Sequence, residues 1–250
     1  NLKETKKKIT SFIEPTKLKE IPILELNSVD ETTKKAERGD QIQILKDRII
    51  KIGTTMQSTA VDYGKVLIDH VFNVKGIGTV VLGLVQGDIE AGKMYEILPI
   101  KEKGNDSKKI VLRSIQIHDR NFKTGLRGDR VGLALKGISA DAMDRNTLLT
   151  DIGKCKLIKE LRIHLHVLPF YKPQQNNAIS PKNRIDYHLI SNLGITPIDI
   201  LEGDDITPGS SGDLKIKLNN SLPMENGAFK GILMYFEPFQ KRLRIIGYFH

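Results

Sequence analysis

The fold is decided by residues 68–83, which read Ile-Asp-His-Val-Phe-Asn-Val-Lys-Gly-Ile-Gly-Thr-Val-Val-Leu-Gly. Runs rich in β-branched residues stand on either side of Gly76 and Gly78. Glycine adopts positive φ angles without steric cost, so the stretch predicts two strands joined by a tight turn. A dinucleotide-binding loop would need a third glycine and a following helix, whereas a strand-like run, Val80 to Val85, follows here.

The same rhythm of short apolar runs and glycine-containing turns continues along the chain. One set of predicted strands covers residues 66–74, 80–85, 94–98, 110–117 and 131–135. A second set covers residues 161–168, 186–190, 214–218, 231–236 and 243–249, with a joint between the sets at 150–153. Many short strands at close spacing are typical of antiparallel barrels and sandwiches. The sequence therefore predicts a mainly β protein with two consecutive antiparallel β units.

The first 52 residues have a different pattern. A charged segment at 2–13 is compatible with a helix, and the apolar run at 21–26 predicts a buried strand. Apolar residues recur at helical spacing after Asp40, whose carboxylate can accept backbone N–H groups, so a helix is predicted over 40–52. Helix, strand and helix together form an α/β fragment that is too short to be a domain by itself.

Composition restricts the class of protein. The 250 residues carry a formal net charge of +9 and 39% hydrophobic residues, which excludes wholesale disorder and favours a polyanionic partner such as nucleic acid. No apolar run reaches the ~18–20 residues of a membrane span. The single cysteine, Cys155, excludes a disulfide framework and suggests a reducing, cytoplasmic compartment. Because the chain begins at Asn1 without a signal peptide, we expect that an N-terminal portion is missing.

Catalytic and metal-binding motifs are sparse. The chain contains no G-x-S-x-G, H-E-x-x-H or phosphate-cradling G-x-x-x-x-G-K-[ST], so no catalytic activity is predicted for these residues. His164 and His166 share one face of a predicted strand with Arg162, and solvated histidines are favoured there over a metal site. Cys155 is predicted to be buried as an apolar residue. The opposite face of the same strand is predicted to enter the core through Ile163, Leu165 and Val167.

Residues 68–83 resemble domain II of the translational GTPases, most closely the selenocysteine-specific elongation factor branch and its archaeal paralogues. The match continues in order through residues 85–87, 98–100, 113–116 and 128–137, and residues 243–247 resemble the last strand of domain III. The resemblance implies two consecutive antiparallel β-barrels, domain II over 61–152 and domain III over 153–250. Residues 1–60 would be the C-terminal remnant of an α/β GTPase domain.

The resemblance also implies a binding site. In the family, domain II contributes to the pocket for the aminoacylated 3′ end of tRNA, and the matching positions here are Asp69, His70, Gln116 and Arg130. Arginine and histidine offer donors to an anionic or acceptor-bearing aminoacyl group, and the Gln116 amide could bond the terminal ribose. Structural alternatives stay open, since Asp69 could simply pair with Arg130 or Lys65. Asn27 and Ser28 would be the remnant of a guanine-binding loop.

The functional expectation is an elongation-factor-like protein that binds the acceptor end and T-arm of aminoacyl-tRNA. Its expected partners are tRNA and the ribosome, with no membrane or DNA partner. No cofactor is expected in this chain, whereas GTP and magnesium could bind a full-length parent. The alternative is a non-translational protein-interaction scaffold derived from an elongation factor that has lost GTPase activity. A metal-dependent enzyme built on His164 and His166 is a third hypothesis.

Overall fold

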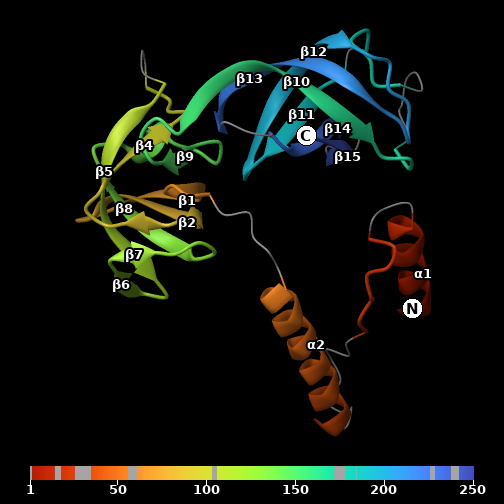
Figure 1. The fold of residues 1–250 in the computed structure, drawn as a ribbon, viewed down its shortest axis with the longest axis horizontal. Coiled ribbons are helices and arrows are strands. Elements are labelled where there is room, and N and C mark those ends of the chain that lie inside the picture. The colour runs from red at the N-terminus through yellow and green to blue at the C-terminus, as the bar shows by residue number, and fades with distance from the viewer. Residues whose placement is uncertain are drawn as a thin grey trace. The chain divides into compact units, whose positions relative to one another are not determined.

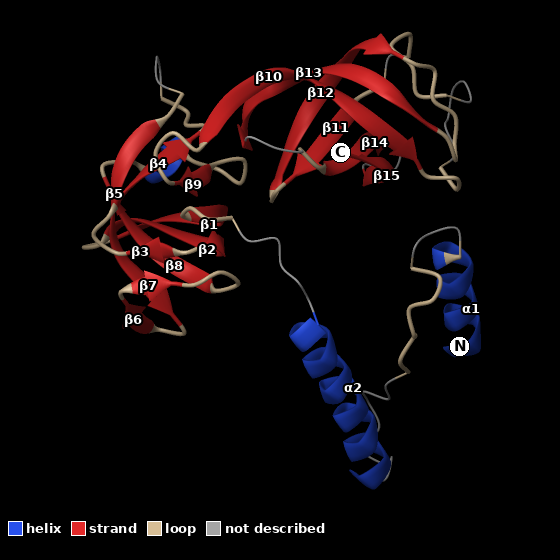
Figure 2. Ribbon diagram, viewed as in Figure 1, coloured by secondary structure: helices blue, strands red, loops and turns tan. Residues whose placement is uncertain are grey.

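The computed structural model describes residues 2–14, 18–25, 35–55, 61–102, 106–171, 178–183, 185–225, 229–237 and 242–250. The chain divides into two compact units, Asn1–Thr59 and Ala60–His250. Helices are the regular elements in the described part of the first unit, and strands dominate the second (Figure 2). Among the described residues, no helix combines the length and apolar character required to cross a membrane.

The first unit contains α1 (Leu2–Ile13) and α2 (Lys35–Thr55). The helix predicted at 2–13 is confirmed, but α2 begins before Asp40, so the capping role proposed for Asp40 is wrong. The residues preceding Gly39 are strong helix formers, Lys-Ala-Glu-Arg, and they outweigh the cost of one glycine, about 1 kcal/mol.

The strand predicted at 21–26 is also wrong within its described part, Ile21–Glu25, which is irregular. Ile21 is 54% exposed and Leu24 is 38% exposed. A strand satisfies its backbone groups by pairing with another strand, and the described residues of this unit contain no strand with which residues 21–25 could pair.

The first barrel of the second unit confirms the strand-turn-strand prediction. β1 (Lys65–Val74) pairs with β2 (Gly78–Gly87) through a turn in which Ile77 donates its N–H to the Val74 carbonyl at 3.1 Å. Gly76 and Gly78 both have positive φ, +83° and +97°. The barrel closes in the order β4-β9-β1-β2-β8-β5 and back to β4 (Figure 1), the further members being β4 (Met94–Leu98), β5 (Lys108–Ile117), β8 (Arg130–Lys136) and β9 (Leu148–Thr150).

Short elements decorate this barrel. β6 (Arg120–Phe122) extends the sheet beyond β5, and β3 (Ile89–Glu90) pairs with β7 (Thr124–Gly125). The 3₁₀ helix η1 (Ala140–Ala142) precedes β9. These pieces lie below the length at which a periodic pattern can be seen, and none was predicted.

The second barrel begins at β10 (Cys155–Val167) and is closed in the order β10-β13-β12-β11-β14-β15. Its other strands are β11 (Tyr187–Ser191), β12 (Gly194–Gly203), β13 (Ser211–Glu225), β14 (Gly231–Glu237) and β15 (Arg242–Phe249). β12 was not predicted; it contains Pro197, and a proline argues against an internal strand because it lacks the backbone N–H. The predicted fold class, two consecutive antiparallel barrels, is confirmed.

Each barrel has its own apolar core. In the first core Ile68, Val81 and Leu133 are completely buried. In the second core the predicted inward face of β10 is confirmed, with exposures of 3%, 0% and 4% at Ile163, Leu165 and Val167. A third small cluster consists of Leu67, Leu98, Leu148 and Cys155.

Cys155 lies at the start of β10 and is 7% exposed, so its predicted burial is confirmed. Burial, reinforced by the nearby Glu225 carboxylate, raises the pKa of the Cys155 thiol to about 11. The thiol therefore remains protonated at neutral pH and is a poor nucleophile. Close by, Lys65 of β1 forms an ion pair with Glu225 at the end of β13.

Candidate functional site

A β-bulge in β1 creates the charged part of the candidate site. Ile68 pairs with Gly83 and His70 pairs with Leu82, so Asp69 is an extra residue without a partner of its own on β2. A bulge re-aims side chains relative to the regular alternation of a strand. Asp69 and His70, consecutive in the chain, consequently both contact the same arginine, Arg145.

The Asp69 carboxylate is the acceptor for two arginines. Arg130 Nη2 donates to Asp69 Oδ2 at 2.7 Å, and Arg145 Nη2 lies 3.3 Å from Oδ1. Arg145 also donates through Nε to the Asp69 backbone carbonyl at 3.0 Å. Partial burial raises the pKa of the Asp69 carboxyl, but His70 and the two arginines lower it, and the net result is a pKa below its ordinary value. Asp69 is therefore ionised at neutral pH.

His70 is held in one orientation by the same groups. Its Nε2 lies 3.4 Å from Arg145 Nη2, and its Nδ1 lies 3.2 Å from Asp69 Oδ2. A guanidinium can only donate and a carboxylate can only accept, so the neutral ring carries its hydrogen on Nδ1. The ring is also stacked on Phe72, with centroids 6.0 Å apart and planes within 7°. In the neutral form both ring nitrogens of His70 are therefore engaged, and the arginine side chains supply the donors that an acceptor group would meet.

Gln116 lies on the same sheet, in one cross-strand row with His70. His70 pairs with Leu82, Leu82 with Gly132, and Gly132 with Gln116, so the row crosses β1, β2, β8 and β5. Three inter-strand steps place His70 and Gln116 roughly 14 Å apart. The row continues to Asn121 of β6, whose Oδ1 accepts a hydrogen bond from Gln116 Nε2 at 3.2 Å.

Between these polar ends the outer face is apolar and shallow. Leu82 is half-buried, and a Cβ built on Gly132 would make ordinary contacts with Leu82 Cδ2 at 3.6 Å, the Gln116 Cβ at 3.8 Å and the Gln116 carbonyl oxygen at 4.0 Å. Leu84 pairs with Arg130, and Phe72 lies next to His70 on the same face; these two apolar side chains are 38% and 43% exposed. The arrangement is a short apolar floor with a cationic cluster at one end and a primary amide at the other.

The structure thus brings Asp69, His70 and Arg130 together and places Gln116 at the far end of their row. That these residues bind an aminoacyl end stays a prediction. Arg145 was missed, because it lies 76 residues after Asp69 in a loop with no local motif. The predicted guanine-loop remnant, Asn27 and Ser28, lies outside the described residues.

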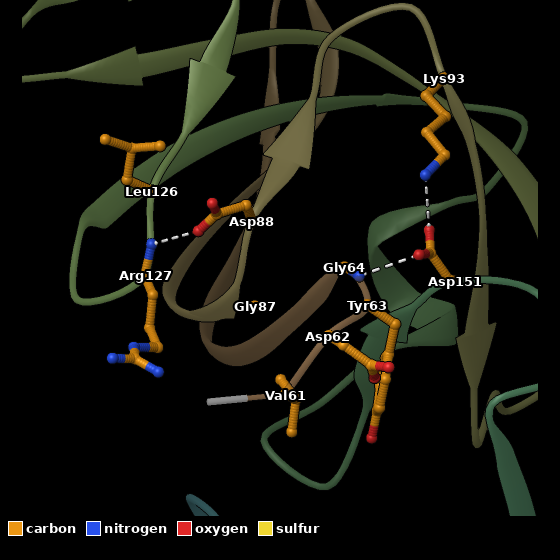
Figure 3. A pocket seen from close by; sticks show the side chains of 10 residues that line it. All are labelled: Val61, Asp62, Tyr63, Gly64, Gly87, Asp88, Lys93, Leu126, Arg127 and Asp151. Atoms are coloured by element: carbon orange, nitrogen blue, oxygen red, sulfur yellow. Dashed lines mark hydrogen bonds and ion pairs between the residues drawn. The ribbon is translucent and has the colours of Figure 1, made fainter. Parts of the chain in front are cut away.

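A separate hollow, whose lining side chains are drawn in Figure 3, lies just before β1. Its volume is about 540 Å³. Its charged groups are largely engaged: Lys93 Nζ lies 3.0 Å from Asp151, and Asp88 accepts the Arg127 backbone N–H at 2.8 Å. Asp151 also accepts the Gly64 N–H at 2.9 Å. None of the four predicted pocket residues lines this hollow.

The histidines of β10 are on the outer face of the second barrel, as predicted from their spacing. His164 Nδ1 lies 2.6 Å from Asp213 Oδ1, and a third histidine, His250, is adjacent to both His164 and His166. Within the part of the chain that the structure describes, no group of three or more His, Cys, Asp or Glu side chains is arranged to hold a metal ion.

The succession of two six-stranded barrels is shared with translation elongation factors of known structure. Translation elongation factor SelB from Methanococcus maripaludis, in its apo form, matches with a TM-score of 0.68 at 20% identity, over 88% of this chain and 55% of that one. Its complex with the GTP analogue GppNHp matches with a TM-score of 0.72 at 22% identity, over 98% and 54%. The fold is therefore that of the elongation-factor class.

The sequence narrows this resemblance to one branch. The selenocysteine-specific elongation factor of Methanocaldococcus jannaschii is 31% identical over 141 residues, 56% of this chain and 28% of that protein. An uncharacterised protein of the same organism is 42% identical over 107 residues, 42% of this chain and 32% of that protein. No family model matches. The chain resembles selenocysteine-specific elongation factors in sequence and fold, and it spans about a third of these curated relatives and about half of the solved structures.

Proposed function

We propose that the chain is part of an elongation-factor-like protein whose first barrel binds the aminoacylated 3′ end of a tRNA. The observation that carries the proposal is the single cross-strand row from His70 to Gln116, with the Asp69–Arg130–Arg145 cluster at one end. The protein would act in the cytoplasm, with tRNA and the ribosome as partners. GTP and magnesium would bind residues outside this chain.

The chemistry of the row suits a nucleoside that carries an acyl group. The apolar floor offers van der Waals contact to a flat base, and the Gln116 amide can both donate to and accept from ribose hydroxyls. At the other end, one carboxylate faces two guanidinium groups, so the Asp69–Arg130–Arg145 cluster has one positive charge in excess. That excess favours an aminoacyl side chain that is anionic or rich in acceptors.

Methyl NMR spectroscopy of the chain, titrated with a CCA-ended acceptor minihelix, tests the proposal. We expect the aminoacylated minihelix to shift the methyl signals of Val80, Leu82 and Leu84, and to leave Leu189 of the second core unchanged. The deacylated minihelix should produce smaller shifts near Arg130. If neither minihelix shifts these methyl groups, the proposal is wrong and the protein-interaction scaffold becomes the better description.

A further inference from the structure

The outer face of the second barrel carries a stack of aromatic rings. His166 of β10 stacks on Tyr248 of β15 with centroids 4.9 Å apart and planes at 19°. His166 also stacks on His250 at 5.1 Å and 11°. His164 packs edge-on against both imidazoles, at 4.9 Å and 5.8 Å. We call the three near-parallel rings, Tyr248, His166 and His250, the ring stack.

The strand register explains why these rings meet. His166 pairs directly with Tyr248 across the β10–β15 ladder, and the His164 N–H donates to the His250 carbonyl. Alternation along β10 buries Leu165 between the two histidines and leaves both imidazoles outside. The ring stack therefore lies outside the apolar core.

Tyr248 remains 46% exposed, and His250 is also exposed. The apolar surface continues from Tyr248 along the same cross-strand row to Ile232, which is 36% exposed. Flat rings on the convex outside of a barrel cannot enclose a small ligand, which usually requires a concave pocket. They can support flat groups that are strung along a polymer and bound at several points.

Cationic side chains lie beside the ring stack. Arg162 is two residues before His164 on the same face of β10, and it pairs across the strands with Lys215. Both cations are paired with carboxylates: Arg162 Nη2 lies 3.7 Å from Glu202, and Lys215 Nζ lies 3.3 Å from Glu160 and 3.8 Å from Glu202. The side chains of these pairs are partly to largely exposed, and ion pairs at such sites contribute little, so a phosphate can compete with the carboxylate partners.

We propose that the ring stack is a platform for the unpaired bases of a single-stranded RNA, with Arg162 and Lys215 contacting its phosphates. Aromatic side chains on a sheet surface, flanked by cations, bind single strands because every base presents a π face. Paired bases are unavailable, since their faces are covered within the helix. The platform is separate from the aminoacyl site of the first barrel and does not depend on it.

A labelled twelve-nucleotide RNA with one central 2-aminopurine tests the platform. Fluorescence anisotropy reports binding, and quenching of 2-aminopurine reports stacking specifically. We expect both signals with the unmodified chain. The double variant Tyr248→Leu/His250→Ala should bind roughly five- to a hundredfold more weakly and lose the quenching.

Two variants serve as controls. His188→Ala, a histidine on β11 of the same barrel, should bind like the unmodified chain, and so should Arg127→Met in the first barrel. The platform is overturned if the unmodified chain gives no anisotropy change, or gives one without quenching, because phosphate contacts alone then explain it. It is equally overturned if the double variant binds normally, or if His188→Ala or Arg127→Met abolishes binding.

Discussion

The Asp69 carboxylate organises the candidate site at the scale of single residues. Its acceptor oxygens position Arg130 and Arg145, and its backbone carbonyl is a third acceptor for Arg145. The sequence motif identified Asp69 and Arg130, and their pairing was foreseen as a structural alternative. Arg145 could not be foreseen, because its role depends on how the chain folds back after η1, and no spacing rule links it to Asp69.

The first prediction concerns the ionisation of Asp69. Because its folded pKa is lowered from 3.8, its charge contributes stability that is present above that value and lost as the pH falls through the folded pKa. The variant Arg130→Met lacks one of the groups that lower the pKa of Asp69, so we expect this pKa to be higher in the variant than in the unmodified chain. Carboxyl-detected NMR titration measures it directly, with Arg127→Met as the matched control. An identical Asp69 titration in Arg130→Met and the unmodified chain would contradict the geometry.

The second prediction concerns the thiol of Cys155. Because the thiol is buried and its pKa is raised to about 11, we expect it to resist Ellman's reagent at pH 8 while the protein is folded. Addition of denaturant should release one equivalent of reactive thiol rapidly. Rapid reaction of the folded protein at pH 8 would show that Cys155 is accessible.

At the scale of strands, Gly83 of β2 and Gly132 of β8 allow the effect of a substitution on packing to be distinguished from its effect on binding. A Cβ on Gly132 meets only ordinary contacts, whereas a Cβ on Gly83 would lie 2.6 Å from the Leu67 carbonyl oxygen and from Val66 Cγ1. A methyl group at Gly132 would therefore occupy only free space on the outer face of the barrel. A methyl group at Gly83 would collide with the neighbouring strand β1.

The third prediction follows from that contrast. Gly132→Ala should fold normally, with an unfolding free energy unchanged or raised by up to about 1 kcal/mol, and should bind the aminoacylated minihelix more weakly because its methyl group occupies the floor. Gly83→Ala should lower the thermal midpoint. Differential scanning calorimetry and anisotropy measure the two effects. If the Gly132→Ala protein binds the minihelix as tightly as the unmodified chain does, the apolar floor is not part of the binding site.

Strands were predictable from the sequence where apolar and polar residues alternate and the flanking residues favour turns. They were less predictable elsewhere. Met94–Leu98 was predicted with its observed bounds, and the Gly76–Gly78 turn had the expected positive φ angles. β12 was missed because Pro197 weakens its pattern, although barrel closure fixes it between β11 and β13. The run at 21–26 has strand composition but no pairing partner among the described residues, so composition alone was misleading.

For the whole molecule, the net charge of +9 becomes informative only in combination with the fold. Our fourth prediction is that tRNA affinity falls as salt rises, because each phosphate contact releases counterions. Plotting the logarithm of the association constant against the logarithm of the KCl concentration should give a straight line of negative slope. An affinity independent of salt would exclude a binding mode based on phosphate contacts.

The most direct test of the central claim is the ratio of dissociation constants for the deacylated and aminoacylated forms of one tRNA. We predict a ratio well above one for the unmodified chain, a ratio that falls towards one in Arg130→Met, and an unchanged ratio in the matched control Arg127→Met. Equal affinity for the two forms, or a ratio that Arg130→Met does not alter, would contradict the claim that the outer face of the first barrel holds the aminoacyl end.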